Sequence, residues 1–105
     1  MNSFSEKDWK LFRNKISEWQ EAYMEKLLKE YTALLTGEGN ASDKFWELEK
    51  RIREDKNDCG VQCKMSRSNQ FYIMLSLLNN GAITFDDLED FSEDLKDIMK
   101  HFAGK

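Results

Sequence analysis

The sequence predicts an all-α protein, a single small antiparallel bundle of four helices that begins with one long helix. Large apolar side chains recur at steps of three and four over residues 9–34, and again over residues 88–102. This period is that of an amphipathic helix whose apolar stripe faces a core. The 105 residues include no proline, so no proline ring interrupts a helix. Because the connections are short, we expect residues 1–105 to form one antiparallel helical domain.

The first predicted helix spans residues 6–36. Its apolar stripe continues in phase across Ser17, where a second N-cap could otherwise divide it. Ser5 is a typical N-cap, and Phe4 before it is placed to pack against Trp9 as a hydrophobic staple. Such a helix is roughly 46 Å long, which is more than a compact domain of this size requires. The stripe consists of Trp9, Phe12, Ile16, Trp19, Tyr23, Leu27, Tyr31 and Leu34.

Two shorter helices are predicted in the middle of the chain. The second helix spans residues 43–55 with Ser42 as its N-cap, and its thin apolar face places it at the surface of the bundle. The third helix spans residues 67–79, with Ser66 or Ser68 as its N-cap. It is apolar nearly all round, so we expect it to be the most buried element. The apolar residues of the second helix are Phe45, Trp46, Leu48 and Ile52.

The fourth predicted helix begins after its N-cap Thr84 and runs without a break to residues 101–103. Thr84 and Asp87 match a capping box, and Ile83 is placed to pack against Leu88. The stripe of this helix consists of Leu88, Phe91, Leu95, Ile98 and Phe102.

Charge and hydropathy limit the classes of function. The formal net charge of −4 argues against direct nucleic-acid binding, because proteins that follow phosphates usually carry a basic excess. The longest apolar run, residues 71–78, is far shorter than the roughly 20 residues of a membrane span. The N-terminus also lacks the pattern of a secretory signal, so we expect a cytoplasmic protein with no membrane contact.

Acidic side chains dominate the fourth predicted helix. An ordinary solvated helix face explains them, and a docking surface for a basic partner is the alternative. Their spacing lacks the pattern of a calcium loop, so we expect no metal there. The candidate binding residues of this acidic face are Asp86, Asp90, Glu93, Asp94 and Asp97.

Lys64 and Arg67 precede the aromatic residues 71–72 and form a small basic–aromatic cluster with them. Two basic residues are too few for a convincing nucleic-acid site, so a helix start with core aromatics behind it is the simpler interpretation. Arg51 and Arg53 could enlarge the cluster if the fold brings them near.

Cys59 and Cys63 form a C-x₃-C pair. A structural zinc site usually needs two Cys pairs, or a Cys pair with a His pair, whereas the single histidine is the distant His101. We therefore expect two free thiols, with a redox role as the alternative, and no metal or other cofactor. Because no familiar catalytic motif is present, we expect no catalytic residues and not an enzyme. An enzyme would need a cleft that gathers carboxylates such as Glu47 or Glu54.

Three segments of the chain resemble a group of small bacterial proteins of unknown function. They are DWKLFRNKISEWQEAYMEKLLKEY (8–31), NASDKFWELEKRI (40–52) and NNGAITFDDLEDFSEDL (79–95). Some members of the group are labelled multidrug transporters, a label that the absence of a sufficiently long apolar segment does not support. The resemblance implies a bacterial, cytosolic, helical protein and supplies no activity for any residue.

These observations predict a non-catalytic protein-binding or regulatory module of a bacterium or of its mobile elements, with an unknown protein partner. One alternative is a phage-type inhibitor of a nucleic-acid enzyme such as a CRISPR nuclease. Another is a small homodimeric structural protein, because the long first helix has more apolar stripe than three shorter helices can cover. The large aromatics of the first helix are of types that anchor interfaces, although a place in the core explains them more simply.

Overall fold

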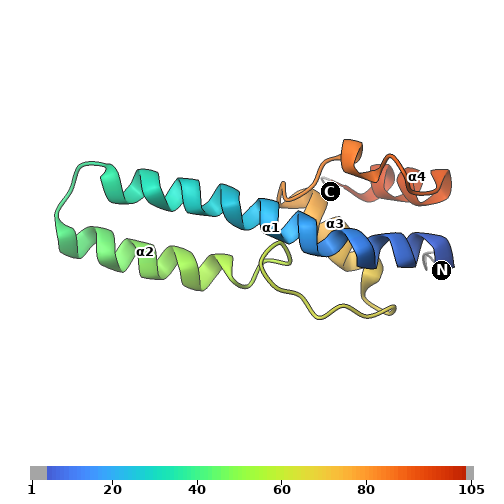
Figure 1. Ribbon diagram of the computed structural model, residues 1–105, viewed down its shortest axis with the longest axis horizontal. Coiled ribbons are helices and arrows are strands. Elements are labelled where there is room, and N and C mark those ends of the chain that lie inside the picture. The colour runs from blue at the N-terminus through green and yellow to red at the C-terminus, as the bar shows by residue number, and fades with distance from the viewer. Residues whose placement is uncertain (1–4, 104–105) are drawn as a thin grey trace.

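The computed structural model describes residues 5–103, and within that range every regular element is a helix. The chain forms α1 (Glu6–Thr36), α2 (Ala41–Asp55), α3 (Gln70–Asn79), the short 3₁₀ helix η1 (Phe85–Leu88) and α4 (Glu93–Phe102) (Figure 1). The all-α class and the long first helix are therefore confirmed.

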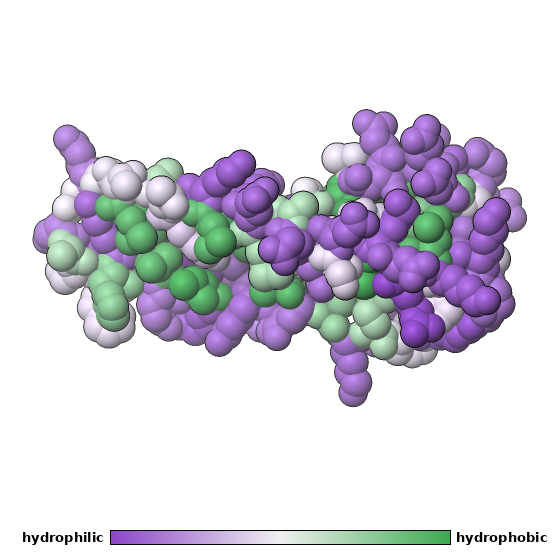
Figure 2. All heavy atoms as spheres, in the orientation of Figure 1, coloured by the Kyte–Doolittle hydropathy of each residue, from purple (hydrophilic) through white to green (hydrophobic). Residues whose placement is uncertain are grey.

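The molecule is elongated, with extents of 51 × 24 × 22 Å (Figures 1 and 2). Its radius of gyration is 16.2 Å, against about 13 Å for a compact domain of this length. We call residues 20–36 of α1 together with α2 the arm. We call residues 6–19 of α1 together with α3, η1 and α4 the head. The single antiparallel bundle is not confirmed, because α2 runs antiparallel to the arm half of α1 while the other helices surround the head half.

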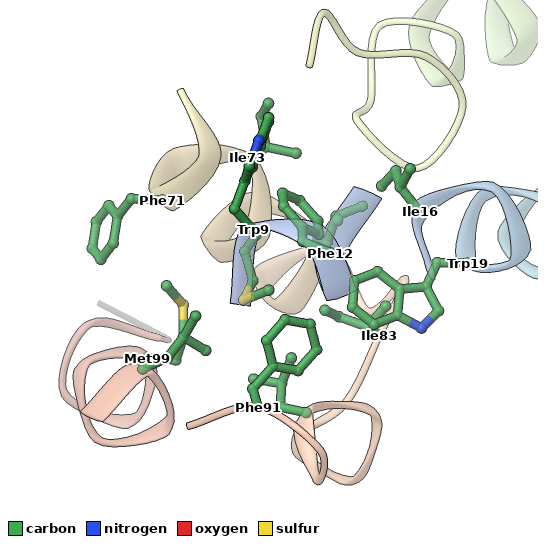
Figure 3. Packing of buried hydrophobic residues seen from close by; sticks show 13 residues of the cluster. Trp9, Phe12, Ile16, Trp19, Phe71, Ile73, Ile83, Phe91 and Met99 are labelled. Atoms are coloured by element: carbon green, nitrogen blue, oxygen red, sulfur yellow. The ribbon is translucent and has the colours of Figure 1, made fainter. Parts of the chain in front are cut away.

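The head holds the main hydrophobic core. The first half of the α1 stripe packs there against α3 and the C-terminal segment, and Figure 3 shows Phe12, Trp19 and Phe91 converging between them. The ring centroids of Phe12 and Trp19 lie 5.9 Å apart, and those of Trp19 and Phe91 lie 6.2 Å apart. The buried residues of this core are Trp9, Phe12, Ile16, Trp19, Phe71, Ile73, Met74, Leu77, Ile83, Leu88, Phe91, Leu95 and Met99.

The start and the continuity of α1 agree with the sequence prediction. The Ser5 hydroxyl accepts a hydrogen bond from the backbone N–H of Asp8 at 3.1 Å, which satisfies a free donor of the first turn. The helix passes Ser17 without a break. Phe4 lies outside the described residues, so its packing against Trp9 remains a prediction.

The predicted starts of the next two helices are corrected by the structure. Asn40, not Ser42, caps α2, and its side-chain oxygen accepts from the backbone of residue 43 at 3.0 Å. Helix α3 begins at Gln70 rather than at residue 67, because the hydroxyls of Ser66 and Ser68 lie 3.2 Å from each other and cap no helix.

The fourth predicted helix is two helices, so its continuity was predicted wrongly. Thr84 does form a capping box with Asp87, but it caps only the short η1. The chain bends after η1, and α4 begins anew with Ser92 as its N-cap, whose hydroxyl accepts from the backbone of residue 95 at 3.3 Å. The restart changes the buried face, so Met99 is fully buried while Phe102 is 39% exposed.

A buried carboxylate explains why the helix restarts at Ser92. Asp8 is only 3% exposed, and its two oxygens accept from the backbone N–H of Ser92 at 3.0 Å and from the Ser92 hydroxyl at 2.6 Å. A negative charge at a helix N-terminus also interacts favourably with the helix dipole. Asp8 therefore ties the first turn of α1 to the first turn of α4, across 84 positions of sequence.

We expect Asp8→Ala to lower the free energy of unfolding by about 1–3 kcal/mol, since it leaves the α4 terminus without its acceptor. Urea unfolding followed by circular dichroism measures this. The cost of Asp8→Ala combined with Ser92→Ala should be smaller than the two single costs added together, because both remove one interaction. The control is Asp97→Ala on the exposed side of α4. Equal costs for Asp8→Ala and Asp97→Ala would contradict the role of Asp8.

Candidate protein-interaction surface on the arm

The arm has a thin core of its own. Tyr23, Leu27 and Tyr31 are buried, and the half-buried Leu48 of α2 packs against them. Gly60, just beyond α2, lies so close to the Tyr23 ring that a Cβ there would overlap it. A single α1 stripe and one partly buried α2 side chain thus provide most of the apolar packing between the two arm helices.

Polar contacts compensate for this thin core. The hydroxyl of Tyr23 donates to Asp58 at 3.0 Å, and that of Tyr31 donates to Asp55 at 2.6 Å. The Arg51 guanidinium lies 5.4 Å from the Tyr31 ring centroid, a cation–π distance. Burial, together with the neighbouring carboxylates, raises the pKa of both tyrosines to about 12. These contacts join the C-terminal part of α2 and the residues just beyond it to α1.

One face of the arm is apolar and exposed to solvent. No residue of α2 is buried. Five large apolar side chains of the arm are nonetheless 43–64% exposed. They are Leu28 and Leu35 on α1 and Phe45, Trp46 and Ile52 on α2.

Helical geometry places four of these side chains on a common side, whereas Trp46, one residue after Phe45, lies about 100° further round α2, at its outer edge. Leu28 and Leu35 are two turns apart on α1, and Phe45 and Ile52 are two turns apart on α2. The ion pair of Glu30 and Arg51 occupies the opposite side of the hairpin. Figure 2 shows hydrophobic atoms gathered on one face between α1 and α2. We call this surface, with Leu28, Leu35, Phe45 and Ile52 on it and Trp46 at its outer edge, the arm face.

A shallow groove of about 320 Å³ runs along the α2 edge of the arm face. Its floor is apolar, and its charged rim includes an ion pair between Glu49 and Arg53 at 2.8 Å. The rings of Phe45 and Trp46 meet edge to face at 5.0 Å, which is a favourable aromatic geometry. The groove is lined by Phe45, Leu48, Glu49, Ile52, Arg53 and Lys56. Such a groove suits the apolar side chains of another protein.

The predicted acidic face is exposed, but the structure divides it. Asp86 lies on η1 and Asp90 lies in the bend, whereas Glu93, Asp94 and Asp97 lie on α4. Two of these acids pair within the molecule. Asp90 lies 3.9 Å from the Lys15 amine, and Glu93 lies 2.9 Å from the Lys96 amine. The lysine beside it lowers the pKa of Glu93.

The predicted basic–aromatic cluster is divided as well. Arg67 pairs with Glu6 of α1 and lies 5.7 Å from the Trp9 ring centroid, while Lys64 is exposed in the preceding loop. Arg51 pairs with Glu30 instead. Residues 6 and 30 of α1 are roughly 36 Å apart along the helix axis, so the arm arginines do not enlarge this cluster.

The two cysteines are free and half-buried beside α1. The amide of Gln20 donates to the carbonyl oxygen of Cys59 at 2.8 Å and lies 3.6 Å from the sulfur of Cys63. Burial raises the pKa of the Cys63 thiol, which disfavours the reactive thiolate. Within residues 5–103, no cluster of three or more His, Cys, Asp and Glu side chains is arranged to hold a metal ion. The helices of this range include none with the length and hydrophobicity of a membrane span.

The arm face was missed at the sequence level, although part of it is visible there. Leu28 and Leu35 fall outside the main stripe, and with Met24 they form a second apolar line at helical spacing. Helix α2 was expected at the surface of a bundle, with its thin apolar face turned towards the other helices.

No family model, curated protein or solved structure matches the chain. The resemblance to a group of small bacterial proteins therefore remains a prediction.

The tyrosine contacts predict a loss of stability at high pH. The folded chain holds the protons of Tyr23 and Tyr31 up to about pH 12, whereas unfolded tyrosines release theirs near 10. Their contribution is therefore complete below pH 10 and is lost as the pH rises towards 12. We expect the free energy of unfolding to fall across this interval, and to fall less in Tyr23→Phe/Tyr31→Phe.

Urea unfolding at a series of pH values measures this dependence. The control is Tyr72→Phe, because Tyr72 is 68% exposed and lies on α3 in the head, away from the two arm contacts. If Tyr23→Phe/Tyr31→Phe retained the full alkaline loss, the two arm contacts would not be its cause.

Proposed function

We propose that the chain is a non-catalytic protein-interaction module that binds a protein partner through the arm face. The observation that carries the proposal is the complete absence of buried residues on α2 beside the exposed Phe45, Trp46 and Ile52. The apolar area exposed there is on the order of 500 Å², near the upper end for the largest patch on a monomer, and such patches are often functional.

The polar contacts between α1 and the end of α2 support this proposal. Binding is weakened when flexible groups must be ordered, so a surface held in place beforehand binds more tightly. The hydrogen bond of Tyr31 joins the last residue of α2 to α1, and that of Tyr23 joins Asp58, just beyond α2, to α1. Aromatic side chains such as Trp46 add contact area and are enriched among residues that dominate binding energy. The partner expected for such a face presents an amphipathic helical surface, which would lie along the arm with its apolar side down.

The alternatives differ in how far the geometry supports them. A phage-type inhibitor of a nucleic-acid enzyme is one form of the proposal, with the arm face as its contact. A docking surface on the acidic face is the alternative, and the exposure of all five of its residues is compatible with it. The geometry lends no support to an enzyme through Glu47 and Glu54, which are exposed on α2 and do not line the groove.

A capture experiment separates the arm face from the acidic face. The tagged chain is used to capture partners from its native organism, and they are identified by mass spectrometry. We expect the partner to be lost with Phe45→Ser/Ile52→Ser and retained with Asp90→Lys/Asp94→Lys. The second variant is the matched control, because it changes two exposed residues of the head. Loss of the partner only with the lysine variant would contradict the proposal and favour the acidic face.

A further inference from the structure

The arm is half of a common architecture. Two packed helices with one apolar and one polar face lack the second layer that would cover the apolar face. A second antiparallel pair of helices placed on that face completes a four-helix bundle, whose core forms between the two pairs. We propose that a second copy of this chain supplies that layer, so that two arms pair face to face. This inference rests on the arm face being a protein-binding surface, and it names the partner.

The size of the arm face fits such a pairing. Helix α2 is 15 residues long, or about 22 Å, and two helices side by side are about 20 Å wide. The exposed apolar area on the order of 500 Å², together with its polar edges, approaches the roughly 600–800 Å² per partner that specific interfaces bury. Both copies would bury the same residues, as a two-fold interface requires.

The charges along the two edges of the arm face complement each other. Glu21 and Glu25 precede Leu28 by two turns and one turn, so they edge the arm face along α1. Arg53 and Lys56 follow Ile52 and edge it along α2, where Glu49 pairs with Arg53 and leaves the edge with a net positive charge. The contact of Tyr23 with residue 58 shows that the acidic and basic edges lie at the same end of the arm.

A two-fold axis along the arm would lay α1 of one copy over α2 of the other. The acidic edge of each copy would then face the basic edge of its partner, twice per dimer. Within residues 5–103 the ion pairs do not engage Glu21, Glu25 or Lys56, so these charges remain available to another molecule. Arg53 is 61% exposed despite its pair with Glu49. This arrangement favours a second copy over an unrelated amphipathic helix, because the arm face carries both the acidic edge and the basic edge that complements it.

Sedimentation of the purified full chain over a range of concentrations tests the pairing. We expect a mass near twice 12.4 kDa at high concentration. Reversing the charges of either edge should raise the dissociation constant of the dimer at least about tenfold. The reversals are Glu21→Lys/Glu25→Lys and Arg53→Glu/Lys56→Glu. A mixture of the two reversed chains should recover the dimer, since each positive edge then meets a negative one. This recovery separates a lost interface from a lost fold.

Three outcomes would overturn the inference or its basis. A mass of 12.4 kDa at every concentration would exclude the second copy and leave the capture experiment to test a different partner for the same face. A dimer that persists in Phe45→Ser/Ile52→Ser would show that the arm face is not its interface. A dimer weakened by both reversals but not recovered by the mixture would exclude the proposed two-fold arrangement. Circular dichroism of each variant confirms that its helices remain.

Discussion

The length of α1 controls the rest of the structure. Its 31 residues carry an apolar stripe along both halves, and the remaining chain must cover that stripe with three much shorter α-helices and η1. Helices α3 and α4 and the intervening η1 are all used around the head half. Only α2 is left for the arm, so one side of α1 is covered there and the neighbouring side, with Leu28 and Leu35, is not. The exposed arm face is thus a consequence of covering a long helix with too few partners.

The apolar stripe of α1 is covered by different interactions in the head and in the arm. In the head, large apolar side chains fill a continuous core, and the buried carboxylate of Asp8 joins the first turn of α1 to the start of α4. In the arm, a thin apolar contact is reinforced by phenol–carboxylate hydrogen bonds of Tyr23 and Tyr31. Hydrogen bonds to charged acceptors contribute more than neutral ones, which suits an element that cannot bury much apolar area. The result is a projecting pair of helices with one polar and one apolar side.

The sequence showed several residues of the candidate site individually, but it did not show that they form one exposed surface. The surface position of α2 followed from its thin apolar stripe. Phe45 and Ile52 were expected to face a bundle, however, because short connections normally bring all helices together. The candidate acidic and basic residues were recognised by their charge. In the structure, however, the acidic residues lie on three segments because the last helix breaks before Ser92, and Arg67 forms an ion pair with Glu6.

The sequence by itself determined the helical class, the extent of α1 and its Ser5 cap, because periodicity and capping are local properties of neighbouring residues. Tertiary structure alone decided where the last helix breaks, since Ser92 begins α4 through a carboxylate that lies 84 positions away. It also decided which apolar side chains remain in water. The apolar periodicity of a segment shows which side of its helix a residue occupies. Whether that side is buried depends on how many other helices pack against it.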